Sequence, residues 1–144
     1  MYYYQFDEFI ADINHFSEQF GNYKPDIIVA IARGGVTFGH FLSEKLNLRE
    51  LFTLNSIHYD DTIKRSDIRL SNIPQIAETS KVLVVDDIVD SGETMQEVMS
   101  TLQRLFPTSE FKSGALFYKK DAIYQPDFKV KEAHEWIHFF WNIN

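Results

Sequence analysis

The chain has 144 residues, of which 44% are hydrophobic, so it can bury a sizeable core and does not resemble a disordered protein. Its formal net charge of −7 argues against non-specific binding to nucleic acid, because that binding needs a basic surface. The chain has no cysteine, which excludes disulfides and thiolate metal sites, and it has neither a signal-like N-terminus nor a long apolar run, so we expect a cytoplasmic protein.

The first third of the chain alternates helical and strand patterns. Apolar residues recur at helical spacing from Phe6 to Phe20, which predicts an amphipathic helix that Gly21 ends. Continuous apolar runs predict strands further on, and Arg33-Gly34-Gly35 is expected to form a tight loop. The expected bounds after the first helix are a strand over residues 26–32, a helix over residues 36–46 and a strand over residues 51–59.

Residues 60–74 are polar and charged, with no apolar period. We expect a long, mobile surface loop, and such loops often carry function. Three cations lie in this segment: Lys64, Arg65 and Arg69. They either contact an anionic ligand or belong to an ordinary solvated loop.

The most informative segment begins with an apolar strand over residues 82–85, which ends in Asp86 and Asp87. A short polar loop follows, formed by Asp90, Ser91, Gly92, Glu93 and Thr94. An amphipathic helix over residues 93–106 starts in this loop, so its positive end and a row of backbone N–H groups can bind a phosphate. The two carboxylates suit ribose hydroxyls, either directly or through Mg²⁺.

The C-terminal part predicts a strand over residues 111–118, which ends in Lys119-Lys120, and a short strand over residues 128–130. Alternating strands and helices predict an α/β fold, a parallel sheet flanked by helices, in one domain over residues 1–144. Arg33-Gly34-Gly35, the Asp86-Asp87 pair and Lys119 each follow the carboxyl end of a predicted strand. We therefore expect them to meet in one site.

The central segment is similar to the PRPP-binding motif of type I phosphoribosyltransferases, where PRPP is 5-phosphoribosyl 1-pyrophosphate. That motif has four apolar residues, two acids, two apolar residues and then Asp-(Thr/Ser)-Gly-x-Thr. Here it reads Val82-Leu83-Val84-Val85-Asp86-Asp87-Ile88-Val89-Asp90-Ser91-Gly92-Glu93-Thr94. Glu93 stands where purine-salvage members often have Gly. The resemblance implies a Mg²⁺ cofactor at Asp86 and Asp87 and a small C-terminal purine-binding hood on the sheet.

The resemblance also implies roles for residues in other segments. Arg33-Gly34-Gly35 looks like the pyrophosphate loop of purine phosphoribosyltransferases, which can carry a non-proline cis peptide, here at Ala32–Arg33. Arg65 matches the residue of a flexible flap that contacts pyrophosphate, with Lys64 and Arg69 as alternatives. Asp90 lies where a carboxylate could accept the N7 proton of the purine as N9 attacks the ribose.

Base recognition is implied by the C-terminal residues. Lys119 matches the lysine that reads the O6 atom of 6-oxopurines, with Lys120 as the alternative. Trp136-Ile137 looks like the pair that stacks on the purine and reads it through a main-chain carbonyl. The pattern Trp-Ile-x-x-x-Trp that ends at Trp141 is close to that of bacterial xanthine-guanine phosphoribosyltransferases, although we expect Trp141 itself to pack in the core.

Together these similarities imply a purine-salvage enzyme that joins PRPP to guanine, xanthine or hypoxanthine and releases pyrophosphate. The family also implies a homodimer or homotetramer, for which Tyr2-Tyr3-Tyr4 is a candidate contact.

Simpler interpretations exist for the same residues. Arg33-Gly34-Gly35 could be a plain turn, Asp90 a helix N-cap, Lys119 a solvated strand end, and Trp136 a core side chain. At the level of function, a PRPP- or nucleotide-sensing regulator on the same fold is the alternative to an enzyme. A receiver domain is excluded, because no acidic pair follows the first strand. The five histidines show no metal-ligand spacing.

Overall fold

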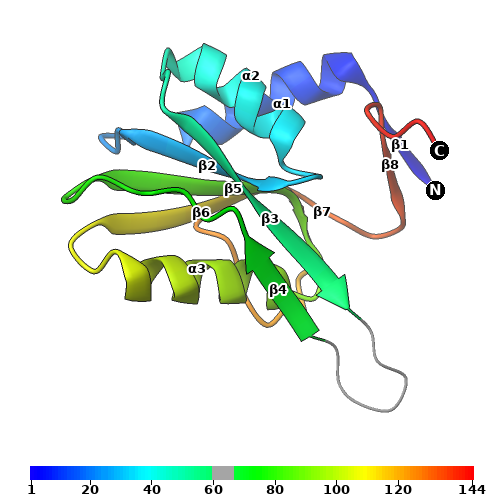
Figure 1. Ribbon diagram of the computed structural model, residues 1–144. Helices are drawn as coiled ribbons and strands as arrows, with labels where there is room; N and C mark the ends of the chain where they lie inside the picture. Colours follow the sequence, from blue (N-terminus) through cyan, green and yellow to red (C-terminus); the bar gives the residue numbers. More distant parts are fainter. Residues whose placement is uncertain (60–66) are drawn as a thin grey trace.

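The computed structural model describes residues 1–59 and 67–144, in which strands and helices alternate as the sequence predicts. The elements in chain order are β1 (Tyr2–Tyr4), α1 (Phe6–Glu18), β2 (Ile27–Ala32), α2 (Val36–Leu46), β3 (Leu51–Tyr59), β4 (Asp67–Ser71), β5 (Lys81–Val89), α3 (Glu93–Leu105), β6 (Glu110–Tyr118), β7 (Phe128–Glu132) and β8 (Ile137–Phe139). A six-stranded sheet, in the order β4-β3-β2-β5-β6-β7, forms the middle layer (Figure 1).

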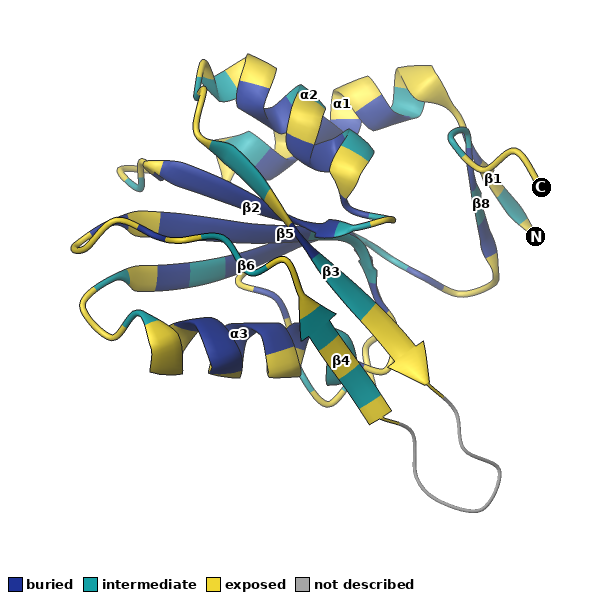
Figure 2. Ribbon diagram, in the orientation of Figure 1, coloured by how far each residue is buried: buried dark blue, intermediate teal, exposed yellow. Residues whose placement is uncertain are grey.

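Helices cover both faces of this sheet, with α1 and α2 on one side and α3 on the other (Figure 1). The side chains of strand β2 alternate between two hydrophobic cores, one on each face of the sheet. Its residues Ile28 and Ala30 pack in the cluster that contains side chains of α1 and α2, while Ile27, Val29 and Ile31 pack in the cluster that contains α3. Because both faces are covered, the inner strands are buried along most of their length (Figure 2). The predicted α/β fold is confirmed.

Strands β2 and β5 lie side by side and parallel at the centre of the sheet. From β2 the chain crosses through α2 to β3 on one side, and from β5 it crosses through α3 to β6 on the other side. The connections therefore diverge at the carboxyl ends of β2 and β5. Ligands of open α/β sheets bind in the crevice at such a switch point.

Two expectations about strands were wrong. Part of the predicted loop over residues 60–74 is a strand, since β4 pairs antiparallel with β3. Its inner side chains Ile68 and Leu70 alternate with exposed neighbours, a pattern too short to stand out in the sequence. Strand β5 also continues to Val89, so Asp86 and Asp87 lie within it rather than after it. Beyond Val85 this strand pairs with β6 alone, because its pairing with β2 ends at Ala30.

The ends of the chain form a second, two-stranded sheet in which β1 pairs parallel with β8 (Figure 1). The sequence predicts a C-terminal hood, but it did not identify β1 as its partner. Tyr4 is buried inside the chain, so it does not serve as the subunit contact suggested for it, whereas Tyr3 is exposed. Among the helices of the described residues, none has the length and apolar character needed to span a bilayer.

Candidate functional site

The loop Arg33-Gly34-Gly35 lies directly on the carboxyl end of β5. A Cβ atom on Gly34 would be 2.5 Å from Asp87 Oδ2, and one on Gly35 would be 2.7 Å from the carbonyl oxygen of Val85. Both glycines are therefore needed for this close approach. The peptide Ala32–Arg33 is cis, as the resemblance implied. Two of the polar clusters found in the sequence are thus in contact.

Asp86 and Asp87 form a half-buried acidic pair. One oxygen of each already accepts a main-chain N–H: Asp86 Oδ1 from Asp87 at 2.8 Å, and Asp87 Oδ1 from Ile88 at 2.7 Å. Burial raises the pKa of both carboxyl groups, and the neighbouring charge of Asp87 raises the pKa of Asp86 further. A cation at this position would relieve both effects.

The acidic pair fits Mg²⁺. That ion is usually held by one or two carboxylates together with waters and substrate oxygens, rather than by a complete cage of protein ligands. No group of three or more His, Asp or Glu side chains that could hold a metal occurs in the described ranges 1–59 and 67–144. The ribose and pyrophosphate oxygens of a ligand would therefore have to complete the coordination.

The predicted phosphate loop leads into α3. Gly92 has a φ of 91° and lies under the backbone of Tyr124, where a side chain would clash. Ser91 Oγ accepts the N–H of Glu93 at 3.2 Å, within the turn that leads into the helix. The loop borders a cavity of about 320 Å³, here called the loop cavity, which Asp86, Asp90, Ser91, Gly92, Glu93 and Thr94 help to line. His58 of β3 also lines it, and its Nε2 atom is 4.0 Å from the Glu93 carboxylate.

A second cavity, of about 570 Å³, is here called the Lys119 cavity. It joins residues from the acidic strand, the end of β6 and the hood: Asp87, Ile88, Asp90, Lys119, Ala133, His134, Glu135, Trp136, Ile137, Phe139 and Asn142. Lys119 Nζ is 3.3 Å from Asp90 Oδ1, and both side chains are partly exposed. Lys120 is not among the lining residues, which favours Lys119 of the two lysines considered.

Trp136 and Ile137 border the Lys119 cavity from the hood. Trp136 is 72% exposed, so its ring is not a core side chain. Its carbonyl oxygen accepts the N–H of Tyr2 at 2.8 Å. In a parallel pair, alternate residues direct their main-chain groups to opposite sides, so Ile137, opposite Tyr2, points its carbonyl away from β1. Ile137 is therefore the residue whose carbonyl is available to a ligand.

A third cavity, also of about 570 Å³, lies beside the loop Arg33-Gly34-Gly35. It is lined by Arg33, Gly34, Thr37, Trp141, Asn142, Ile143 and Asn144. Trp141 stacks on Phe139, with ring centroids 4.7 Å apart, so the expected packing role is confirmed. Asn142 lines this cavity and the Lys119 cavity. Asn142 was not predicted as a site residue, because no motif surrounds it.

Of the three cations in the segment over residues 60–74, the structure describes only Arg69. Lys64 and Arg65 lie outside the described residues. Arg69 lies on β4, where its guanidinium is 3.2 Å from Asp67 and 4.9 Å from the centre of the Tyr59 ring. Its charge is already matched within β4 and β3, which favours Arg65 or Lys64 over Arg69 for an anionic ligand.

Comparisons with known proteins agree with this geometry. A family model described as a phosphoribosyl transferase domain matches residues 3–144. The chain is 29% identical over 120 residues to a xanthine-guanine phosphoribosyltransferase of Idiomarina loihiensis, a match that covers 81% of this chain and 71% of that protein. The structure resembles the xanthine-guanine-hypoxanthine phosphoribosyltransferase of Helicobacter pylori, with a TM-score of 0.91 and 39% identity over 99% of this chain and 94% of that one. A purine phosphoribosyltransferase from Pyrococcus horikoshii has a TM-score of 0.83 and 27% identity over 96% of this chain and 92% of that one.

Removing both charges of the acidic pair should stabilise the metal-free protein. A carboxyl group whose pKa is raised in the folded state favours folding when protonated, and that advantage is lost as the pH rises from the ordinary value of about 3.9 through the raised one. At pH 7 in EDTA, we expect Asp86→Asn/Asp87→Asn to raise the melting temperature by about 2–4 °C, the effect of 1 kcal/mol in a domain of this size.

The gain should shrink as the pH falls through the raised pKa values and be lost by about pH 4, because the carboxyls of the folded wild-type protein are then protonated. Asp121→Asn, a change at an exposed carboxylate, is the matched control and should shift stability by less than about 0.5 kcal/mol. A gain that is the same at pH 4 and pH 8 would show that the charge of the pair is not its cause.

Proposed function

The chain belongs to the phosphoribosyltransferase family, and we propose that it transfers the 5-phosphoribosyl group of PRPP to a 6-oxopurine. The products are a nucleoside 5′-monophosphate and pyrophosphate, so the reaction is one of purine salvage. The similarity to proteins named for xanthine, guanine and hypoxanthine supports this substrate class. The cytoplasmic location and the dimer or tetramer stay predictions.

One observation carries the proposal. The Lys119 cavity is lined by Asp87 and Asp90 of the PRPP motif and by Lys119, Trp136 and Ile137 of the expected base site. A ribose held by the acidic pair and a purine held under the hood would therefore meet in one space. The volume of about 570 Å³ lies within the range of cavities that hold small-molecule ligands.

The polar edge of a 6-oxopurine matches the Lys119–Asp90 pair. The O6 and N7 atoms lie next to each other on that edge. Lys119 can donate to O6, and Asp90, 3.3 Å away, can accept a proton from N7. A 6-aminopurine presents a donor instead of O6, which a lysine cannot accept. The pair therefore favours guanine, xanthine or hypoxanthine over adenine.

In the proposed reaction, N9 of the base attacks C1′ of the ribose while the bond to pyrophosphate breaks. The 5′-phosphate would lie in the loop Asp90–Thr94, where backbone N–H groups and the positive end of α3 stabilise it. Asp86 and Asp87 would hold the ribose hydroxyls and the cation. Arg33, Gly34 and Gly35 would bind the leaving pyrophosphate through a guanidinium and N–H groups. Bound Mg²⁺ would neutralise the charge that develops on pyrophosphate.

A product assay tests the proposal directly. PRPP is incubated with guanine, xanthine, hypoxanthine or adenine, each with and without Mg²⁺, and the nucleotide is separated by chromatography. We expect nucleotide from the 6-oxopurines with Mg²⁺, and none from the folded Asp86→Asn/Asp87→Asn variant. If PRPP binds but no nucleotide forms with any base, the chain is a sensor and the proposed reaction is wrong.

Lys119→Glu should change base choice. It replaces a donor to O6 with a carboxylate that repels O6. We therefore expect kcat/KM for guanine to fall, and the fall should correspond to a loss of ~2–4 kcal/mol of transition-state stabilisation. Adenine should lose much less. Trp136→Ala is the comparison variant, and it should weaken all purines alike, because stacking does not read the 6-substituent. An equal loss for guanine, hypoxanthine and adenine in Lys119→Glu would show that Lys119 does not read the base.

Arg65→Ala should weaken the use of PRPP far more than the use of purine. The prediction rests on the position of Arg65 in the sequence, where the family has a residue that contacts pyrophosphate. The measurement is steady-state kinetics with each substrate varied in turn, and the same measurement on Lys64→Ala shows which of the two candidate residues makes the contact. A change confined to the KM for purine would contradict the assignment.

A further inference from the structure

The strand that carries the base-binding residues is not part of the main sheet. Trp136 precedes β8, Ile137 begins it, and the only strand paired with β8 in the described chain is β1. The register aligns Tyr2 with Ile137 and Tyr4 with Phe139. The position of Ile137 above the Lys119 cavity therefore depends on where β1 is held.

A further cavity lies on the other side of Ile137. This space, of about 490 Å³, is lined by Tyr2, Phe117, Val130, Lys131, Glu132, His134, Glu135 and Ile137. Ile137 thus borders both this cavity and the Lys119 cavity. Side chains therefore do not completely fill the space around Ile137, and the contacts made by β1 add to the core packing of Ile137 and Phe139 in fixing the position of β8.

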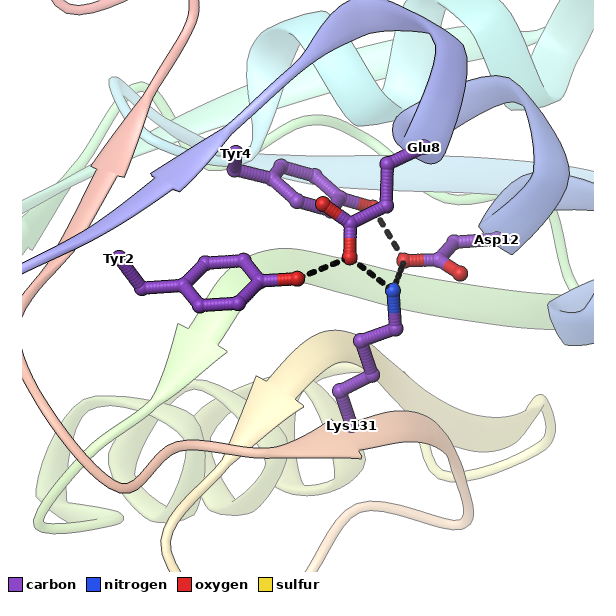
Figure 3. A network of polar contacts seen from close by, with 5 residues as sticks. All are labelled: Tyr2, Tyr4, Glu8, Asp12 and Lys131. Carbon is purple, nitrogen blue, oxygen red and sulfur yellow. Dashed lines mark hydrogen bonds and ion pairs between the residues drawn. The ribbon is translucent and has the colours of Figure 1, made fainter.

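Strand β1 is held by a polar network that joins three elements (Figure 3). The Tyr2 hydroxyl donates to Glu8, and the Tyr4 hydroxyl donates to Asp12 Oδ2 at 2.6 Å. Glu8 and Asp12 lie one turn apart on α1, and Lys131 of β7 contacts both of them, at 3.1 Å in the case of Asp12. Two hydroxyls of β1 are thus bound to two carboxylates that a single ammonium group holds together.

The network holds two carboxylates and one ammonium group, so Glu8 and Asp12 share the positive charge of Lys131. Asp12 is only 3% exposed. Burial alone would lower the pKa of Lys131, but its hydrogen bonds to Glu8 and Asp12 outweigh that effect and raise the pKa. Burial, and then the hydrogen bond to Asp12, raise the pKa of Tyr4. At neutral pH, Lys131 is therefore charged and both tyrosines keep the protons that they donate.

The network is connected to the base site by packing as well as by the backbone. The Tyr4 ring lies edge-on to Phe139, with centroids 5.7 Å apart, and Phe139 lines the Lys119 cavity. The hydrogen bond from the Tyr4 hydroxyl to Asp12 is directional, so it fixes the position of the Tyr4 ring in addition to the packing of the rings around it.

We infer that Glu8, Asp12 and Lys131 are positioning residues for base binding, which act through Tyr2 and Tyr4 of β1 on the hood strand β8. The inference rests on the proposed function, since it names what sets the affinity of that site for the purine. None of the five residues touches the Lys119 cavity. Their effect on the reaction is therefore indirect, and it should be confined to the base.

The test is the KM for guanine and for PRPP in Lys131→Met, with kcat and the melting temperature measured in the same preparations. Losing a charged hydrogen-bond partner should raise the KM for guanine roughly tenfold. The KM for PRPP should change by less than about twofold, because the acidic pair and the phosphate loop lie on the main sheet. A merely structural role would lower stability and the active fraction, and neither of these changes KM.

Matched controls come from the same strands. Lys129→Met removes a lysine of β7 whose ammonium contacts Gln125 and the Tyr118 ring, and Tyr3→Phe removes an exposed hydroxyl from β1. Both should keep the wild-type KM for guanine. Lys131→Arg, which retains the charge, should restore most of the base affinity that Lys131→Met loses.

The outcomes separate the two claims. If the wild-type protein makes no nucleotide, the proposed function is wrong and the positioning role falls with it. If the wild type is active and Lys131→Met keeps the wild-type KM for guanine, or raises both KM values equally, only the positioning role is wrong. Should Lys131→Met not fold, Tyr2→Phe, which loses one hydroxyl at the edge of the network, decides by the same comparison.

Discussion

Everything in the site depends on the contact between Gly34 and Asp87, where the loop after β2 meets the carboxyl end of β5. The two strands are neighbours at the switch point of the sheet, so the loop has no room for a side chain that would push the Asp87 carboxylate aside. This contact joins the expected pyrophosphate loop to the expected ribose site. The leaving group and the sugar would therefore be held by two segments that cannot move independently.

The charge distribution shows how an acidic chain can bind a strongly anionic substrate. With a formal net charge of −7, long-range attraction does not favour PRPP. In the proposed function, capture would come from local groups: the Arg33 guanidinium, the N–H groups at the start of α3, and a cation at the acidic pair. Burial raises the pKa values of Asp86 and Asp87, and the charge of Asp87 raises the pKa of Asp86 further, so the pair is unfavourable when empty and favourable when a cation is bound.

Local patterns in the sequence predict the half of the site that lies on the main sheet. The helix over residues 36–46 and the strand over residues 51–59 have the expected bounds, and the Asp86-Asp87 segment is recognisable because strand, acids, loop and helix follow one another directly. The pairing of β1 with β8 was missed, because it joins residues at opposite ends of the chain through two three-residue strands. Asp12 was missed for a related reason. In the sequence it looks like the solvent face of an amphipathic helix, and only the fold brings Lys131 and Tyr4 to it.

The two halves of the site differ in how well the sequence predicts them, because the expected sugar-phosphate site lies on the main sheet and the expected base site lies at the two-stranded sheet. Binding of the sugar phosphate needs backbone N–H groups, glycines and carboxylates at fixed spacing, and such features are local in sequence. In the proposed function the base would lie between Lys119 and the residues at β8, and β8 belongs to a small sheet whose two strands are separated by most of the chain. Two short strands are marginally stable without further support. The network of Glu8, Asp12 and Lys131 on α1 and β7 binds the two tyrosines of β1. If the positioning role holds, residues that do not line the cavity would set the affinity for the base with little effect on the PRPP site.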